Sequence, residues 1–408
     1  MLRLNDGQLL ESLDRLAGIG AIEGGGCARL ALSDEDRAGR DLVVGWMKEL
    51  GLRLQVDAIG NVVGVRPGTE DLPPVMTGSH IDTVRTGGRY DGNYGVLAGL
   101  EVVRALNDAG VKTRRPVAVA FFTNEEGARF QPDMMGSLVY AGGMGLNEAY
   151  AATDKDGRSV GDELRRIGYL GPARPGAIRP HAFVELHIEQ GPILDEEKVR
   201  IGVVESVQGI SWTEYGVNGV SNHAGTTPMR LRRDAGYLAA SVSVFARALA
   251  LEMGGDQVAT VGTMGFRPNL INVVPNRAVF TVDLRNTDEE KLKHAEARVA
   301  AHIAEVAAAE RVEVEARVLA RFEPVIFDAG LVDRVEHHAR ALGLGTRRMP
   351  SGAGHDAQMM QRLCPTAMIF VPSVDGLSHN VKEHTEPADL VAGAQVLLNL
   401  MVELAGET

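Results

Sequence analysis

The chain has 408 residues, more than one ordinary hydrophobic core supports, so its length predicts two domains. It is 45% hydrophobic and 24% charged, as soluble globular proteins are, and we find no uninterrupted apolar run long enough to span a bilayer. The formal net charge of −12 argues against nucleic-acid binding, and it means that local cations must capture any anionic substrate.

Two features bear on the cellular compartment. The N-terminal segment MLRLNDGQLLESLDRLAGIG mixes charges into its apolar positions, unlike a signal peptide. The two cysteines, Cys27 and Cys364, are too few for a disulfide framework and suit a reducing environment. We therefore expect a cytoplasmic protein without a membrane partner.

The elements predicted over the first 210 residues alternate between helices and strands. Apolar side chains at helical spacing predict helices, and runs of β-branched and aromatic residues predict strands. The helices are expected within 6–51 and at 96–110, and the strands within 52–68 and at 75–80 and 115–122. Such alternation is typical of a mainly parallel sheet covered by helices.

The pattern changes between about Ser211 and Phe327. Strands are expected at 211–223, 257–266, 277–286 and 312–322, and helices at 235–253 and 288–309. Two helices over an antiparallel sheet would form an inserted α+β domain. Beyond residue 328 the α/β pattern returns, with TAMIFVPSV as a buried strand. We therefore expect an α/β domain split between 1–210 and 328–408, with the inserted domain at 211–327.

Several metal-ligand side chains follow expected strands or lie in loops between them. They are found in SHID (His80, Asp82), YDGN (Asp91), TNEEG (Glu125, Glu126), LHIEQG (His187, Glu189, Gln190) and LSHN (His379). The carboxyl ends of parallel strands open into loops that converge on ligands. Histidine and carboxylate side chains are the ligands that zinc prefers, and a carboxylate can bridge two ions. Asp82 is expected to orient the imidazole of His80 from behind.

Each of these residues also has an ordinary structural interpretation. A single histidine at a strand end is more often a hydrogen-bonded core or surface residue than a ligand. Adjacent acids such as Glu125 and Glu126 are usually solvated. Here they follow a strand expected to be buried, where two carboxylates repel each other unless a cation compensates. The metal interpretation is therefore favoured by the segments jointly.

Together these segments resemble the hydantoinase/carbamoylase amidases, a branch of the zinc amidase, aminoacylase and carboxypeptidase superfamily. The resemblance covers about residues 75–390. Its motifs are TGSHIDTV, GGRYDGNYGVLAGLE, FTNEEGARF, HIEQGPIL, SNHAGTTPM, NVVPN, DLRN, SGAGHDAQ and LSHN. It implies a zinc-peptidase-like catalytic α/β domain and an inserted lid domain through which two chains form a homodimer.

The resemblance also implies a role for individual residues. Two divalent ions per subunit are expected, Zn²⁺ first and Mn²⁺, Co²⁺ or Ni²⁺ as alternatives. Their ligands would be His80, Asp91, Glu126, His187 and His379, with Asp91 bridging. Glu125 would be the general base that activates water and then protonates the departing nitrogen. His223 would stabilise the oxyanion.

Substrate binding is expected from four further residues. The planar guanidinium of Arg285 suits a carboxylate, although it could instead form a surface ion pair with Asp283 or Asp288. The other expected substrate contacts are Gln190, Asn272 and His355.

The expected reaction is hydrolysis of the carbamoyl C–N bond of an N-carbamoyl-L-amino acid, giving amino acid, carbon dioxide and ammonia. The motifs do not separate this activity from that of an allantoate amidohydrolase or a β-ureidopropionase. A metallo-aminoacylase or peptidase is disfavoured, because those relatives generally have a carboxylate where this chain has His187. A catalytically inactive binding protein is disfavoured because Glu125 and every expected ligand are present.

Overall fold

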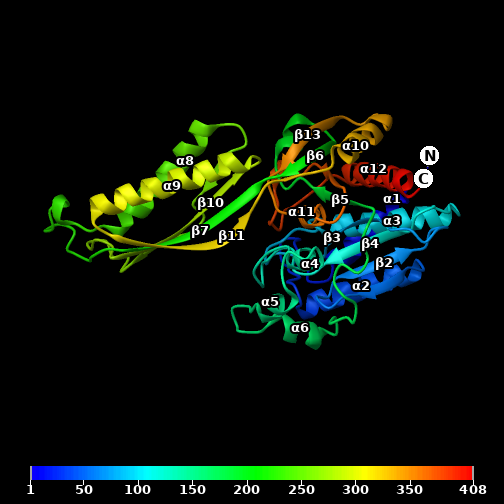
Figure 1. The fold of residues 1–408 in the computed structure, drawn as a ribbon, viewed down its shortest axis with the longest axis horizontal. Coiled ribbons are helices and arrows are strands. Elements are labelled where there is room, and N and C mark those ends of the chain that lie inside the picture. Colours follow the sequence, from blue (N-terminus) through cyan, green and yellow to red (C-terminus); the bar gives the residue numbers. More distant parts are fainter. Residues whose placement is uncertain (1, 407–408) are drawn as a thin grey trace. The chain divides into compact units, whose positions relative to one another are not determined.

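The computed structural model describes residues 2–406 and divides into two compact units. The first unit comprises residues 1–205 and 326–408, and the second comprises residues 206–325. The borders that we expected from sequence lie near residues 210 and 328. Figure 1 shows the elements of both units.

The first unit is built on one large mixed sheet. Its strands are β1 (Arg53–Val56), β2 (Val62–Arg66), β3 (Val75–His80), β4 (Val117–Phe122), β5 (Ala182–Ile188), β6 (Ile201–Val207), β12 (Val325–Ile326), β13 (Thr346–Ser351) and β14 (Thr366–Val371). The order is β1-β2-β4-β3-β5-β14-β6-β12, with β13 paired to β6. The four central strands, β4, β3, β5 and β14, are parallel, whereas the β1/β2, β2/β4 and β14/β6 pairs are antiparallel. The sheet is therefore parallel where the expected ligands lie.

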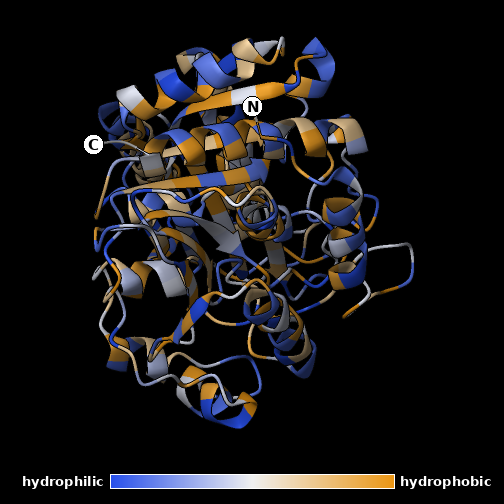
Figure 2. Cartoon of the chain, turned by 90° about the vertical axis from the view of Figure 1, so that its right-hand side faces the viewer, coloured by the Kyte–Doolittle hydropathy of each residue, from blue (hydrophilic) through white to orange (hydrophobic). Residues whose placement is uncertain are grey.

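Helices cover both faces of this sheet. They are α1 (Asp6–Ala17), α2 (Asp34–Glu49), α3 (Asn93–Asp108), α4 (Met135–Tyr140), α5 (Leu146–Ala151), α6 (Val160–Ile167), α7 (Ile193–Glu197), α10 (Ala329–Ala341), α11 (Asp356–Met360) and α12 (Pro387–Gly406). Helix α3 packs against β3, β5 and α12, and α11 packs against β3, β5 and α4. In Figure 2 the outer helices alternate between hydrophobic and hydrophilic residues, as expected of helices with one buried face.

Close packing explains why the central strands are almost entirely apolar. Every residue of β4 and of β14 is buried, as expected of parallel strands covered on both faces. Gly78 on β3 lies so close to β4 that an added Cβ would be 2.3 Å from the Ala120 oxygen. Small residues in the sheet therefore let neighbouring elements approach, and this packing fixes the strand ends that carry the site.

The second unit has two helices on one antiparallel sheet. Its elements are β7 (Gly209–Asn218), α8 (Ala235–Met253), β8 (Val258–Thr260), β9 (Met264–Arg267), β10 (Arg277–Asn286), α9 (Glu289–Glu310) and β11 (Glu313–Phe322). Strand β10 is antiparallel to β7, β8 and β9, and β11 is antiparallel to β7. Residues alternate along β10 between buried and half-buried, and Phe280, Val282 and Leu284 pack into the core with α8 and α9.

Two helices in the described residues, α8 and α12, are long and apolar enough to cross a membrane by length and composition alone. Most of α12 is buried against β5, β14 and α3, as is typical of a core helix. Helix α8 packs on α9 and the sheet of the second unit. Both cysteines are free and buried.

Candidate metal centre

The first group of possible metal ligands lies at the carboxyl ends of adjacent parallel strands. His80 is the last residue of β3, and His187 lies near the end of β5. The Nε2 atoms of these two histidines are 3.5 Å and 3.2 Å from the same oxygen, Oδ1 of Asp91. All three side chains are buried. The structure therefore brings together three of the five expected ligands.

The second group lies on the other side of Asp91. His379 Nε2 is 3.5 Å from Oδ2 of Asp91 and 3.2 Å from Oε2 of Glu126. The His379 side chain is about half exposed, whereas the Glu126 side chain is 4% exposed. Asp91 thus has one carboxylate oxygen toward each group, which is the arrangement that a bridging carboxylate requires.

A glycine allows the Asp91 backbone to pass this close to His80. Gly92 has φ +66°, and an added Cβ would lie 2.4 Å from atoms of the His80 ring. A side chain at this position would displace the imidazole. The glycine of the YDGN motif is therefore required by the close approach as well as by its backbone conformation.

Hydrogen bonds orient the rings of His80 and His187 as metal ligands require. Their Nδ1 atoms lie 2.9 Å from the Asp82 oxygen and 2.8 Å from the Ile188 oxygen, so each Nδ1 carries the proton that it donates to a carbonyl. In the neutral ring the lone pair of Nε2 then faces a carboxylate oxygen of Asp91, and in His187 it also accepts from the Gly92 amide at 3.1 Å. Two lone pairs at this distance repel each other unless a proton or a metal ion lies between them. The donor set therefore fits a divalent cation.

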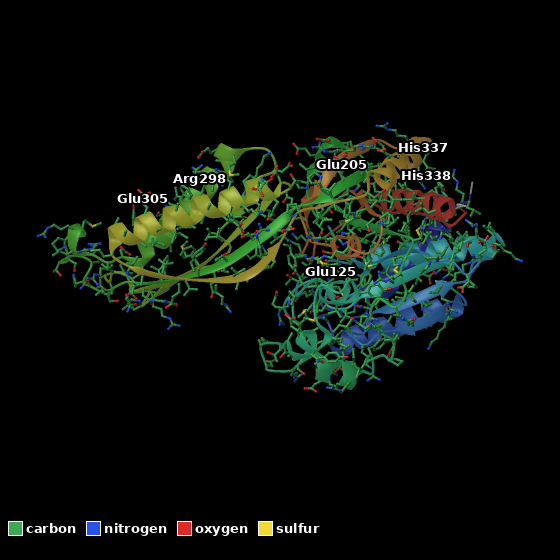
Figure 3. All side chains as sticks on the ribbon, viewed as in Figure 1. Glu125, Glu205, Arg298, Glu305, His337 and His338 are labelled. Atoms are coloured by element: carbon green, nitrogen blue, oxygen red, sulfur yellow. The ribbon has the colours of Figure 1, made fainter. Side chains whose placement is uncertain are left out.

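Glu125 lies beside the first group. It follows β4, it is 7% exposed, and its Oε2 is 3.3 Å from His80 Nε2. Burial, together with the charges of Asp356, Glu126 and Asp91, raises the pKa of Glu125 well above its ordinary value, although His80 opposes the shift. Figure 3 labels Glu125 in the first unit, apart from His337 and His338 on α10. A buried carboxyl with a raised pKa suits an acid–base group.

Asp82 has a different role from the one expected. Its carboxylate oxygens accept hydrogen bonds from the backbone amides of Glu125 and Glu126, at 3.3 Å and 3.4 Å. It is the backbone oxygen of Asp82, not the carboxylate, that contacts His80 Nδ1. The prediction assumed an extended segment, but β3 ends at His80 and residues 81–84 lie in irregular backbone. Asp82 therefore fixes the adjacent pair of glutamates.

Gln190 and His355, both expected to contact substrate, lie close to the metal ligands. Gln190 has φ +59° and donates from Nε2 to Oδ2 of Asp91 at 2.8 Å. Its Oε1 is buried without a hydrogen-bond partner within residues 2–406, so it can still accept from a ligand. His355 is 1% exposed, contacts Ser351 Oγ at 2.8 Å and packs edge-on against His187. His355 therefore supports His187 from behind and does not face the solvent.

His223 lies on a loop of the second unit that pairs with the loop carrying Asn272. The Ala224 amide donates to the Asn272 oxygen at 2.9 Å. Nδ1 of His223 accepts from the backbone amides of Gly225 and Thr226, at 3.1 Å and 3.2 Å. The proton of the neutral ring is therefore on Nε2, as a donor to an oxyanion requires. Both His223 and Asn272 are exposed.

Arg285 forms the ion pair that was the alternative to substrate binding. Its Nε and Nη2 atoms lie 3.1 Å and 2.9 Å from the carboxylate of Asp283, two residues earlier on β10. The guanidinium also lies over the Trp212 ring. The Asp288 side chain caps the start of α9. The side-chain alternation along a strand places residues i and i+2 on one face, so the sequence contained the signal for this pair.

Two polar residues near Asp91 were not singled out from the sequence. Ser378 Oγ lies 3.1 Å from Oδ2 of Asp91. Glu383 is buried and accepts from the backbone amide of Asp91 at 3.2 Å. Burial, and then the charge of Asp91, raises the pKa of Glu383 to about 7. His384, which follows Glu383, is about half exposed and lies 3.5 Å from Glu386.

Comparison with known proteins gives consistent relatives. Residues 76–403 match the model of peptidase family M20/M25/M40. The chain is 45% identical to an N-carbamoyl-L-amino-acid amidohydrolase of Rhizobium meliloti over 99% of this chain and 97% of that protein. It is 36% identical to an allantoate amidohydrolase of Escherichia coli, with 97% of each covered. A solved amidase of the hydantoinase/carbamoylase family from Burkholderia multivorans superposes with a TM-score of 0.94 at 45% identity, covering 100% of this chain and 99% of that one.

Proposed function

Because this chain belongs to peptidase family M20/M25/M40, and there to the hydantoinase/carbamoylase amidases, we propose that it hydrolyses the carbamoyl C–N bond of a small ureido carboxylate. The observation that carries this proposal is the pair of ligand groups on either side of Asp91, with Glu125 beside them. The preferred substrate class is the N-carbamoyl-L-amino acids. The products are the amino acid, carbon dioxide and ammonia.

We assign the metal ligands residue by residue. His80 and His187 would hold one ion through Nε2, and His379 and Glu126 would hold the other, with one oxygen of Asp91 toward each. Two divalent ions held by these residues would polarise the carbamoyl oxygen and lower the pKa of water. The mixture of imidazole and carboxylate suits Zn²⁺, and it also accommodates Mn²⁺, Co²⁺ or Ni²⁺.

Glu125 would move the proton. Its carboxylate accepts a proton from the attacking water and then delivers it to the nitrogen that leaves, so one group serves as base and acid in turn. Its backbone is fixed by the Asp82 carboxylate and by the Met134 amide, which donates to the Glu125 oxygen at 2.6 Å. A rigid backbone keeps the carboxylate near the reacting atoms throughout the reaction.

The second unit would supply the groups that recognise the rest of the substrate. Nε2–H of His223 donates to the carbamoyl oxygen as negative charge develops on it. Arg285 receives the carboxylate, and Asp283 holds its guanidinium in a fixed plane. The Asn272 amide of this unit and Gln190 Oε1 of the first unit are further polar contacts.

A substrate panel tests this assignment and separates it from its alternatives. N-carbamoyl-L-amino acids, their D-isomers, β-ureidopropionate, allantoate, N-acetyl amino acids and a dipeptide would be offered to the metal-loaded enzyme, with Glu125→Gln protein as the control. We expect ammonia release from the ureido acids and the highest kcat/KM with an N-carbamoyl-L-amino acid. A preference for allantoate or β-ureidopropionate would keep the reaction and change the substrate. Cleavage of the dipeptide without ammonia release from any ureido acid would refute the proposal.

We also infer that the enzyme works as a homodimer in which the second unit is both lid and interface. The paired loops that carry His223 and Asn272 also expose large apolar side chains, namely Met229, Leu231, Leu270 and Ile271. Exposed apolar residues gathered around functional groups are typical of a surface that becomes covered. Covering it with a second copy would bring His223 to the metal ligands of the partner. We place this enzyme in the cytoplasm, which its two unpaired cysteines support.

Mixing two inactive variants tests the dimer. Glu125→Gln chains coexpressed with His223→Ala chains form heterodimers, half of all dimers if pairing is random. Each heterodimer contains one site with both groups intact, so about a quarter of the wild-type activity should return. The separately purified homodimers are the controls. No recovery in a verified heterodimer would mean that His223 serves its own subunit.

A further inference from the structure

Glu383 is a buried carboxylate to which the reaction described above gives no role. It lies in the connection between β14 and α12, the same connection that carries His379, and it is 4% exposed. Burying a carboxylate is costly unless hydrogen bonds compensate for the lost water. Its hydrogen bonds therefore show which part of the protein it serves.

The partners of Glu383 lie on the loop that carries Asp91. Its Oε1 accepts from the backbone amides of Tyr90 and Asp91, at 2.9 Å and 3.2 Å. Its Oε2 is 3.4 Å from Ser378 Oγ, which is also 3.1 Å from Oδ2 of Asp91. The hydroxyl has one proton for two acceptors, so the two backbone amides are the constant partners. Glu383 thus joins two connections that are far apart in the sequence.

The space for this carboxylate is provided by Gly88. A Cβ at Gly88 would lie 2.1 Å from the carboxylate carbon and from Oε1 of Glu383, and 2.3 Å from its Cβ. Any side chain at position 88 would therefore push the Glu383 carboxylate away from the two amides. The glycine that precedes Arg89 and Tyr90 in the GGRYDGN segment is matched to a residue almost three hundred positions later.

We propose that Glu383 is a positioning residue of the metal centre. It holds the backbone of Asp91 and the loop that carries His379 in fixed positions relative to each other. This inference rests on the two-metal site proposed above. Glu383 is absent from the groups of possible ligands found in residues 2–406, whereas Asp91 belongs to two of them. A shift of the Asp91 backbone would therefore disturb both groups at once. Residues that orient metal ligands typically contribute 10–100-fold to metal affinity.

Zn²⁺ affinity of the metal-free, full-length protein tests this role without relying on activity. Competition against a chromophoric chelator gives the dissociation constants, and Co²⁺ absorption reports the ligand geometry. We expect Glu383→Ala to bind Zn²⁺ about 10–100-fold more weakly and to change the Co²⁺ spectrum. Glu383→Gln should stay close to wild type, because its amide oxygen can still accept from Tyr90 and Asp91. Gly88→Ala should behave like Glu383→Ala.

Glu101→Ala is the matched control. Glu101 is a buried carboxylate on α3 that pairs with Arg104, so its loss should lower stability and leave Zn²⁺ affinity unchanged. If Glu383→Ala does not fold, Glu383→Asp takes its place in the same measurements. Its shorter side chain withdraws the carboxylate from both amides, so its Zn²⁺ affinity should also fall. A folded variant with wild-type Zn²⁺ affinity and Co²⁺ spectrum would overturn the proposal. If the wild-type protein bound no Zn²⁺, that result would instead contradict the proposed two-metal site.

Discussion

Replacing Glu125 by glutamine separates proton transfer from metal binding. The substitution keeps the shape of the side chain and leaves both backbone hydrogen bonds of residue 125 in place. The loss of a positioned general base lowers kcat by about 10²–10⁴-fold, which corresponds to about 2.7–5.5 kcal/mol in the barrier. Glu125 is outside the groups of possible ligands in residues 2–406, so metal content should not change.

The same substitution should not lower the thermal stability of the metal-free protein, although it lowers kcat. The raised pKa of Glu125 reflects the burial of its carboxylate and its repulsion by nearby acids, which together outweigh its attraction to His80. A neutral amide removes that repulsion, so the melting temperature of the metal-free Glu125→Gln protein should be equal to or above that of wild type. Steady-state ammonia release, elemental analysis and thermal unfolding give the three quantities.

Glu126→Gln is the matched variant. Its carboxylate lies 3.2 Å from His379 Nε2, in one of the ligand groups. We expect it to lose Zn²⁺ affinity by more than the 10-fold that an outer partner contributes. If Glu125→Gln lost the metal and Glu126→Gln retained it, the roles of the two adjacent glutamates would be reversed.

Two further substitutions test the carboxylate contact and the buried core. Arg285→Lys should raise KM for ureido acids about 10-fold or more, because a charge-assisted bond contributes about 1.5–3 kcal/mol, while KM for a neutral amide analogue barely changes. A wild-type KM for ureido acids in this variant would favour the ion pair with Asp283 over substrate binding. Arg29→Met should lower the free energy of unfolding, measured by urea titration, by about 3 kcal/mol or more. The buried Arg29 guanidinium donates to three backbone oxygens and to Asn93. Each acceptor left without its donor costs about 1–3 kcal/mol. The control is Arg37→Met at an exposed position, which should change the free energy of unfolding by about 0.5 kcal/mol or less. An equal loss of unfolding free energy in both variants would contradict the reasoning.

Elements whose pattern is local were predictable from the sequence. The Ala-rich segment predicts a helix over Ala235–Met253, and α8 has these bounds. The polar residues after 75–80 predict that a strand ends at His80, and β3 does so. In both cases the signal lies within the segment itself, as apolar periodicity or as an abrupt change in polarity.

Predictions went wrong where the chain turns to meet a distant segment. The strand expected up to His223 ends at Asn218, because residues 219–224 leave the sheet and pair with residues 272–276. The helices expected within 6–51 are α1 and α2, but the pattern did not indicate that the stretch between them buries Arg29. These contacts join residues far apart in sequence, which single-segment patterns do not report.

The same limit applies to the candidate site. The ligand types and their strand ends were visible in short motifs, and the structure brings the other four expected ligands around Asp91. The residues that support them were not visible. Glu383 accepts from the Asp91 amide although almost three hundred residues separate them, and Asp82 accepts from the amide of Glu125, which follows another strand. Sequence identifies reactive groups more readily than the hydrogen bonds that place them.

Reconstitution with metal tests the central claim most directly. The protein would be freed of metal with a chelator, and ammonia release from an N-carbamoyl-L-amino acid would be followed as Zn²⁺ is added in known equivalents per chain. We predict no activity without metal and full activity only as the second equivalent binds, as expected of a site in which Asp91 serves two ions. Full activity in a protein shown by elemental analysis to hold no metal, or no ammonia release from any ureido acid with two ions bound, would contradict the account.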